Sequence, residues 1–209
     1  MIKIERPKKS LPEVAAAILN HNEWQQSRLF LANKARCDLQ GFDLTEHNPF
    51  ADVNLSNSLL NDTDISGVIF YRTNLSGTCL RGASASNSIF FAVDFTQASL
   101  AGANLEGTTF VNCILRYTDF SNANLTGANF SNCTMEQLLF RSASLQAARF
   151  IGAVIRTADV TDADLTKAVF AGADLCDIAM NKARKYDEAV FFAANLKKKR
   201  FGRHKTAKV

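Results

Sequence analysis

Proline and histidine are scarce in this sequence, and each scarcity excludes a class of structure or chemistry. No proline follows Pro49, so every later residue has a backbone N–H group. Because a strand inside a sheet needs its N–H groups for pairing, this absence suits a long β-structure. The three histidines are His21, His47 and His204. None lies between residues 50 and 180, so that region lacks the residue that a histidine-dependent triad or dyad requires.

Long apolar runs and clustered metal ligands are also absent. No apolar stretch approaches the roughly 20 residues of a membrane span, and the start, MIKIERPKKS, lacks the apolar core of a signal peptide. We therefore expect a cytoplasmic protein that does not bind membranes. The five cysteines show no CxxC spacing, and the sequence has neither a metal-ligand cluster nor a phosphate-binding loop. We expect no metal, no cofactor, no small-molecule substrate and no catalytic activity.

Acidic residues are absent from 197–209, which holds seven Lys and Arg. Residues 1–36 carry seven Lys and Arg against three Glu, whereas 37–196 carry ten against seventeen Asp and Glu. The net charge is therefore +4 for residues 1–36, −7 for 37–196 and +7 for 197–209, so an acidic body lies between two basic ends. The basic C-terminal end could attract nucleic acid or an anionic surface. Its one aromatic residue, Phe201, argues against stacking on single strands, and we do not expect nucleic-acid binding.

What the sequence does have is an internal repeat of five residues. Every fifth residue from Phe50 to Met180 is apolar, over 27 consecutive positions of which 21 are Phe or Leu. A small or β-branched residue lies two positions before nearly every one of these centres. Nine of the ten glycines lie two positions after a centre, if Leu39 is counted as an earlier centre. A period of five matches neither a lone strand nor an α-helix, and it predicts a chain that turns a corner every five residues.

A second period, of twenty residues, shows how many corners close a coil. One column of like residues is Phe50, Phe70, Phe90, Phe110, Phe130, Phe150 and Phe170. Because identical residues recur every twenty positions, we predict four pentapeptides per coil. Identical residues of successive coils should then stack on one another at a spacing of about 4.8 Å. Over roughly Cys37 to Met180, this pattern resembles the pentapeptide repeat family. The resemblance implies an all-β solenoid, namely a right-handed, four-sided β-helix.

The two ends of the repeat region depart from its register. Ser10 and Glu13 can form a capping box, which predicts an N-terminal helix that covers the open end of the solenoid. Its expected apolar stripe is Val14, Ala17, Ile18, Trp24 and Leu29. Relative to the five-residue repeat, one extra residue falls within 45–49, and another follows Met180. We predict an N-terminal segment (1–36), a β-helix (37–182), an irregular last coil or closing helix (183–201) and a disordered basic tail (202–209).

Smaller constellations in the repeat have structural interpretations. Cys113 and Cys133 are twenty residues apart, and we expect two stacked core thiols. A column formed by Arg116, Glu136 and Arg156 predicts a ladder of surface ion pairs, which contributes little.

The residues that flank the centres predict the functional surface. Those beside the column of Ile65, Ala85 and Leu105, which we call the aliphatic wall, are polar and should face solvent. Those beside the phenylalanine column form the Phe wall, and several of them are large and apolar. The candidate partner-binding patch is Ile69, Tyr71, Ile89, Phe91 and Val111. An exposed apolar patch usually marks a contact, which could be a protein partner, a dimer or the chain's own N-terminal helix.

Two functions from different classes agree with these features. The first is a non-catalytic scaffold that binds a protein partner through rigid outer faces. The second follows from the resemblance, because some pentapeptide repeat proteins bind type II topoisomerases as acidic, DNA-shaped rods and can protect gyrase from quinolones. The acidic body agrees with the second function. The basic ends and the lack of large loops between coils argue against it.

Overall fold

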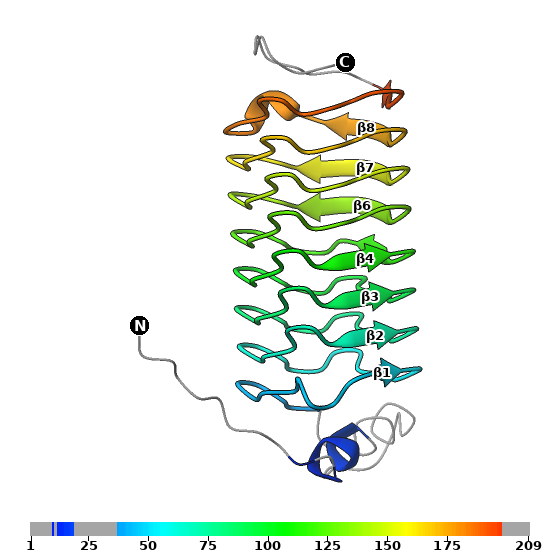
Figure 1. Ribbon diagram of the computed structural model, residues 1–209, viewed down its shortest axis with the longest axis vertical. Coiled ribbons are helices and arrows are strands. Elements are labelled where there is room, and N and C mark those ends of the chain that lie inside the picture. Colours follow the sequence, from blue (N-terminus) through cyan, green and yellow to red (C-terminus); the bar gives the residue numbers. More distant parts are fainter. Residues whose placement is uncertain (1–9, 11, 19–36, 198–209) are drawn as a thin grey trace.

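The chain forms a tall parallel β-solenoid with a short helix at one end (Figure 1). The computed structural model describes residues 10, 12–18 and 37–197. The strands are β1 (Phe50–Ala51), β2 (Ile69–Tyr71), β3 (Ile89–Phe91), β4 (Thr109–Val111), β5 (Ile114–Arg116), β6 (Thr134–Leu139), β7 (Val154–Asp159), β8 (Asp174–Ile178) and β9 (Asn195–Lys197). Strands β1 to β4 form one parallel sheet, and β5 to β9 form a second.

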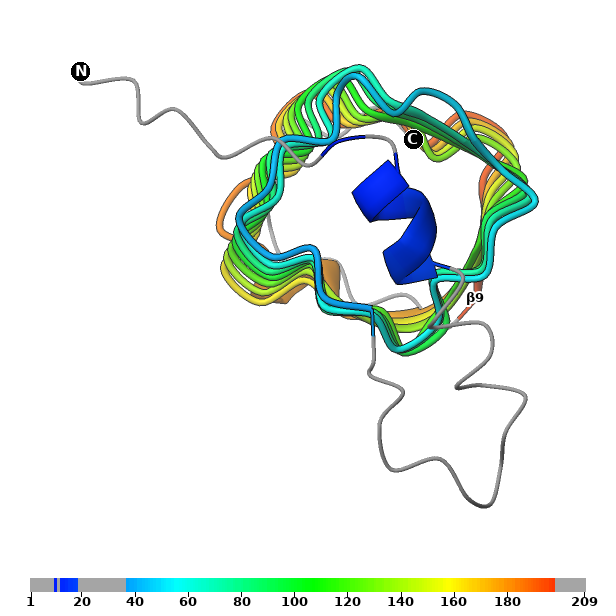
Figure 2. The same ribbon diagram turned by 90° about the horizontal axis from the view of Figure 1, so that it is seen from below.

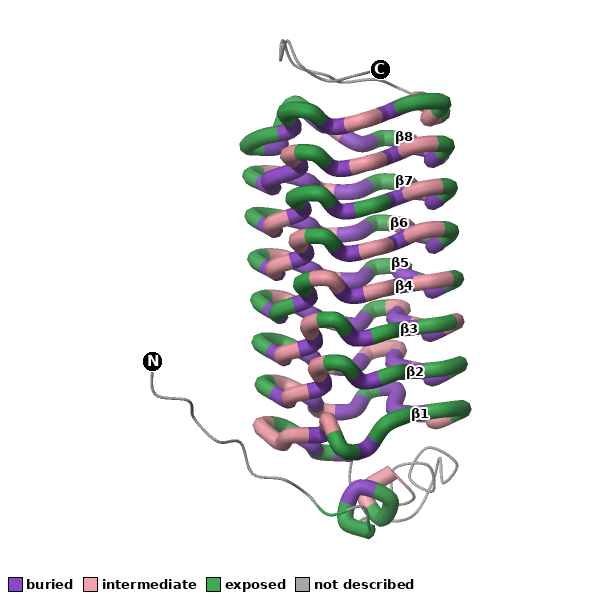
Figure 3. Tube along the Cα trace, viewed as in Figure 1, coloured by how far each residue is buried: buried purple, intermediate pink, exposed green. Residues whose placement is uncertain are grey.

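Strand pairing has a register of twenty residues, as the sequence predicted. Phe50 pairs with Phe70, Phe70 with Phe90, and Phe90 with Phe110. Seen along its axis, the solenoid has a four-sided outline in which successive coils superimpose (Figure 2). The predicted right-handed quadrilateral β-helix is confirmed. Figure 3 shows that buried and exposed residues alternate in the same order on every coil.

Each corner is closed by local hydrogen bonds. At the corner after Ile65, the N–H of Val68 donates to the carbonyl of Ile65 (3.1 Å), and Gly67 between them has a φ of +70°. This left-handed conformation suits glycine, which explains the spacing of glycines in the sequence. The carboxylate of Asp64 also accepts a hydrogen bond from the N–H of Ser66 (3.0 Å).

Stacked phenylalanine rings form the centre of the fold. The rings of the column from Phe50 to Phe191 follow one another at centroid distances of 4.7 to 5.1 Å. Two positions before nearly every centre, a small or β-branched side chain fills the inner corner. Most of the hydroxyls at this position have partners: the hydroxyl of Thr108 donates to the carbonyl of Ala85 (2.7 Å) in the coil below, which offsets the cost of burying it. Among the described residues, the hydroxyl of Ser58 is the exception, since it is buried without a hydrogen-bond partner.

The N-terminal helix, residues 12–18, covers the open end of the solenoid, as predicted (Figure 2). The capping box is present: the N–H of Ser10 donates to the carboxylate of Glu13 (2.8 Å), and the N–H of Glu13 donates to Ser10 Oγ (3.4 Å). Val14 is buried in the core, and Ala17 and Ile18 pack against it. The predicted continuation of the stripe, Trp24 and Leu29, lies outside the described residues.

The two register shifts fall where the sequence places them. Asp43 pairs with Asp64, twenty-one residues on, whereas Asn54 pairs with Asn74, so the extra residue lies between residues 43 and 54. At the other end, Phe170 stacks on Phe191. A 3-10 helix at Met180–Lys182 accommodates the extra residue, and the chain then forms an irregular coil rather than a closing helix. The division of the chain at 36, 182 and 201 stays a prediction, and the proposed tail lies outside the described residues.

Candidate interaction surface

The Phe wall presents its flanking side chains to solvent because strands β2, β3 and β4 alternate inward and outward. Phe70 and Phe90 point into the core, and their neighbours on either side point out. Pairing of β2 with β3 stacks Ile69 on Ile89 and Tyr71 on Phe91. The structure therefore brings four of the five predicted patch residues together on two adjacent coils.

The patch is aromatic and well exposed. Ile69, Tyr71, Ile89 and Phe91 are each 37 to 39% exposed. The rings of Tyr71 and Phe91 stack with centroids 5.4 Å apart. Val111 is half-buried and continues the column above Phe91. An apolar surface of this kind is unusual on a free wall and is typical of a contact region.

A single ion pair borders the patch. The guanidinium of Arg72 lies 4.8 Å from the centroid of the Tyr71 ring and donates to the carboxylate of Asp52 (2.7 Å). Both side chains are more than half exposed, so the pair orients the arginine and contributes little stability. The cation over the ring holds one edge of the patch in place.

The described part of the N-terminal helix does not lie on this patch. Residues 12–18 sit at the end of the solenoid, where Val14 enters the core, and Figure 1 shows them below β1. Residues 19–36 lie outside the described part of the chain. The hypothesis that the helix covers the patch therefore receives no support from residues 12–18.

Acidic residues avoid the Phe wall. From the coil of Phe70 to the coil of Phe191, none of the outward positions on this wall is Asp or Glu. Apart from Asp52, every acidic residue of the range 37–196 belongs to one of the other three walls or their corners. The Phe wall is thus distinguished both by apolar side chains and by the absence of negative charge.

One residue of the aliphatic wall does not face solvent as expected. Asp164 is 2% exposed, because Gln146 and Arg184 from the neighbouring coils reach over its carboxylate. Burial alone raises the pKa of Asp164. The hydrogen bonds from Thr166 and Gln146 and the charge of Arg184 outweigh burial, so the pKa of Asp164 lies below its ordinary value.

Asp159 is a second carboxylate that accepts hydrogen bonds from neighbouring side chains, and it provides a test of their contribution to stability. The hydroxyl of Thr161 (2.6 Å) and the guanidinium of Arg141 (2.6 Å) donate to it and hold its pKa at about 2, although partial burial opposes them. A lowered carboxylate pKa stabilises the fold above the unfolded-state pKa of about 3.9, and this contribution is lost as pH falls towards 2. We expect Asp159→Asn to lower the free energy of unfolding by about 1 kcal/mol at pH 7. The difference from wild type should shrink to nearly zero at pH 2, as measured by urea unfolding at both values; an unchanged difference would contradict this account.

Two further predictions from the sequence concern structure rather than binding. Cys113 and Cys133 are stacked and buried, and their thiols donate to the carbonyls of Phe90 and Phe110 (3.3 Å each). The contact with Cys113, together with burial, raises the pKa of the Cys133 thiol.

The predicted surface ladder is present in the strand register. Glu136 pairs with Arg116 on one side and Arg156 on the other. The Arg116 guanidinium lies 3.6 Å from the Glu136 carboxylate, and both side chains are exposed.

Among the residues that the structure describes, three exposed large apolar residues were not part of the predicted patch. Phe192 is 73% exposed at the far end of the Phe wall, and Ile114 and Tyr117 are 42% and 49% exposed on the next wall. Phe192 could have been found from the sequence, because it follows the recognised centre Phe191. Ile114 and Tyr117 occupy positions that are polar on most coils, and their spacing gives no signal.

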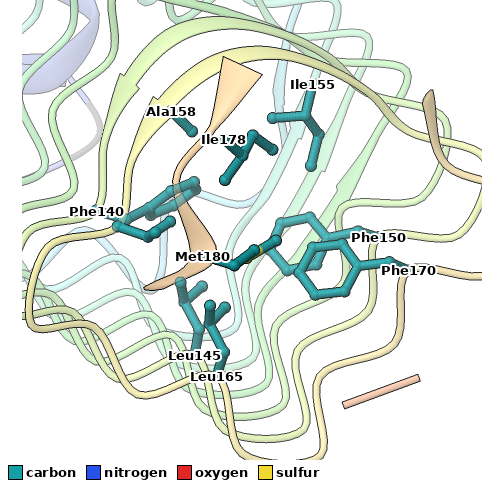
Figure 4. A pocket seen from close by; sticks show the side chains of 10 residues that line it. Phe140, Leu145, Phe150, Ile155, Ala158, Leu165, Phe170, Ile178 and Met180 are labelled. Atoms are coloured by element: carbon teal, nitrogen blue, oxygen red, sulfur yellow. The ribbon is translucent and has the colours of Figure 1, made fainter. Parts of the chain in front are cut away.

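A small apolar cavity lies inside the described part of the solenoid. This cavity of about 10 Å³ near the C-terminal end is lined only by apolar side chains, among them Phe140, Phe170, Ile178 and Met180 (Figure 4). It has about the size of one water molecule and no polar group to hold one. Among the described residues there is no group of three or more potential metal ligands, and no helix is long and apolar enough to cross a membrane.

Solved structures of other proteins are similar to parts of this chain. The solenoid resembles a trypsin-treated form of QnrB1, a plasmid-mediated fluoroquinolone resistance protein (20% identity, 77% of this chain, 82% of that chain, TM-score 0.41). It also resembles HetL, a pentapeptide repeat protein involved in heterocyst differentiation regulation from the cyanobacterium Nostoc sp. strain PCC 7120 (22% identity, 86% and 89%, TM-score 0.31). A third is Rfr23 from the cyanobacterium Cyanothece 51142 (18% identity, 74% and 97%, TM-score 0.32). At these identities the likeness concerns the fold alone.

The sequence itself matches a family. A search of curated proteins found no match. The family model described as "Pentapeptide repeat region" matches residues 63–137 and 109–180. These matches together cover more than half of the chain, and they coincide with the coils that stack at a register of twenty residues. The chain therefore belongs to the pentapeptide repeat family.

Proposed function

We propose that this protein is a non-catalytic scaffold that binds a protein partner through its Phe wall. The observation that carries the proposal is the exposed stack of Tyr71 on Phe91 beside the stack of Ile69 on Ile89, on a wall whose outward positions from the coil of Phe70 onwards hold no acidic residue. Large aromatic side chains dominate the energetics of protein interfaces, and charged residues are depleted at interface centres.

Rigidity supports this proposal. The backbone at the patch is held on both sides by ladder hydrogen bonds, such as those from Arg72 N–H to the carbonyl of Phe91 (2.9 Å) and from Asp52 N–H to the carbonyl of Tyr71 (2.9 Å). The stacked rings inside the solenoid fix the coils relative to one another. A surface that is already ordered loses little conformational entropy when a partner binds.

A double substitution tests the proposal. We expect Tyr71→Glu with Phe91→Glu to reduce capture of the native partner at least tenfold, because it places two charges in a desolvated contact. The matched control is Ser66→Glu with Ser86→Glu, which occupies the same position of the pentapeptide on the aliphatic wall of adjacent coils. Quantitative mass spectrometry of cross-linked pull-downs from the native cell measures the effect. Equal capture by wild type and by the patch variant, with equal melting temperatures, would refute this function.

The alternative is a DNA-mimicking modulator of a type II topoisomerase. It is favoured by one observation: the seventeen acidic residues of 37–196 lie almost wholly on three walls of a straight rod. A regular negative surface can compete with DNA for a basic groove. A gyrase supercoiling assay separates the two functions. If the Tyr71→Glu, Phe91→Glu variant still inhibits supercoiling by gyrase, the DNA-mimicking function is favoured over the scaffold function.

A further inference from the structure

We propose that the Phe wall binds a second copy of this chain, packed antiparallel about a two-fold axis at the coil of Phe130. This inference rests on the proposed function, since it identifies the partner of the same wall. It follows from how side chains are distributed along the whole wall, beyond the patch itself.

Side-chain size changes along the Phe wall. The half nearer the N-terminal end carries the large pairs Ile69 with Tyr71 and Ile89 with Phe91. Four coils beyond Phe90 the same positions hold Val169 with Ala171, and on the next coil they hold Val190 with Phe192. The wall is therefore raised at the coils of Phe70, Phe90 and Phe191 and low at the coil of Phe170.

An antiparallel pair places the raised coil of Phe90 of one copy against the low coil of Phe170 of the other. A two-fold axis that lies in the interface and crosses the solenoid keeps each column opposite itself and reverses the order of coils. With the axis at the coil of Phe130, Phe91 meets Ala171 of the second copy and Ile89 meets its Val169. Tyr71 meets the partner's Phe192, the most exposed apolar residue among those described.

The coil on the axis is the polar one. Asn129 and Ser131 flank Phe130 and would each meet themselves across the axis. An amide and a hydroxyl can each both donate and accept, so identical groups can pair with one another. Any axis shifted by one coil would bury these polar groups against apolar side chains, which costs free energy.

Charge also permits this arrangement. The contacting part of the wall has no carboxylate, and its cations are Arg72 and Arg149. Arg149 would lie opposite Thr109 of the second copy, and Arg72 already pairs with Asp52 of its own chain. No two like charges meet, so electrostatic repulsion does not oppose association.

The parallel arrangement fits less well. With the axis along the solenoid, coils of equal height face one another, so Ile89 meets Phe91 and Val169 meets Ala171. Large side chains then oppose large ones at the coils of Phe70, Phe90 and Phe191, while small ones oppose small ones at the coil of Phe170. In the antiparallel pair, large side chains oppose one another only where the coil of Phe70 meets the coil of Phe191. The two walls would diverge and leave gaps in the contact, which forfeits dispersion energy.

The size of the contact predicts a weak dimer. Seven coils at about 4.8 Å and a side of about four extended residues give about 450 Å² per copy, or about 900 Å² in all. Stable interfaces bury about 1,200 to 2,000 Å². We therefore expect a dimer that dissociates on dilution through the micromolar range.

Introducing opposite charges at Tyr71 and Phe192 tests whether these two residues meet in the dimer. The two residues are six coils apart in one chain, about 29 Å, so they can meet only between copies. In sedimentation equilibrium, the full-length wild type should dimerise with concentration, and Tyr71→Lys or Phe192→Glu alone should weaken dimerisation at least tenfold. The double variant should recover dimerisation and become sensitive to salt. Ser66→Lys on the aliphatic wall is the control and should leave dimerisation unchanged.

A cross-link tests the axis independently of affinity. Ser131→Cys places a thiol opposite its own copy, so mild oxidation with diamide should give a covalent dimer on a non-reducing gel, whereas Ser66→Cys should not.

A wild type that stays monomeric at several hundred micromolar, or a double charge variant that dimerises no better than either single variant, would overturn the dimer. A monomer whose partner capture still depends on Tyr71 and Phe91 would leave the proposed function standing. A dimer with capture unaffected by those residues would refute that function and not the dimer.

Discussion

Leu125→Lys should lower the free energy of unfolding by about 4 kcal/mol or more, which is a large part of the stability of a domain of this size. Leu125 is a fully buried centre, and its backbone N–H donates to the carbonyl of Ser144 in the next coil (2.7 Å). A lysine there must either bury an unpaired charge or break the coil apart. Chemical denaturation monitored by circular dichroism measures the loss.

Its neighbour provides the control. Thr126 is half-buried on the aliphatic wall, and its hydroxyl lies 3.1 Å from that of Ser144. Thr126→Lys can extend into solvent, so it should cost less than about 1 kcal/mol. Similar losses for Leu125→Lys and Thr126→Lys would contradict the inward and outward assignment at this coil.

The second large effect is expected at the middle of the phenylalanine column. Phe130 is fully buried, stacks on Phe110 (4.7 Å) and Phe150 (5.1 Å), and is contacted edge-on by Phe120 and Phe140. Phe130→Ala should lower the free energy of unfolding by about 3 to 5 kcal/mol, because neighbours on all sides are held by their own coils and cannot close the cavity.

The same substitution at Phe192 serves as the comparison. Phe192 is 73% exposed, so Phe192→Ala should change the free energy of unfolding of the chain by less than about 0.5 kcal/mol. Because repeat proteins are stabilised mainly by neighbouring units, Phe130→Ala could also divide unfolding into two steps. A loss at Phe130 no larger than that at Phe192 would show that ring stacking contributes little to this solenoid.

The candidate patch was accessible from the sequence because it depends on the same periodicity as the fold. Once Phe70 and Phe90 are recognised as centres, alternation places their neighbours outside, and the period of twenty places Tyr71 beside Phe91. What the wall binds is not encoded in that periodicity. The antiparallel pairing that we propose depends on comparing the flanking residues of all coils as one surface, up to Phe192 in the irregular last coil.

The sequence by itself determined the architecture, because in a solenoid each coil contacts mainly the coils above and below it. A local period of five and a stacking period of twenty therefore suffice to specify the corners, the register and the two shifts near Pro49 and Met180. The tertiary structure alone decided features that depend on several coils at once. Asp164 is buried because the side chains of Gln146 and Arg184 from neighbouring coils reach over its carboxylate, and the repeat does not specify which way these long side chains extend. The sequence indicates that Val14 faces the core and that Phe192 points outward. How far each side chain is buried or exposed was decided at the ends, where the repeat stops and no neighbouring coil dictates how the chain packs.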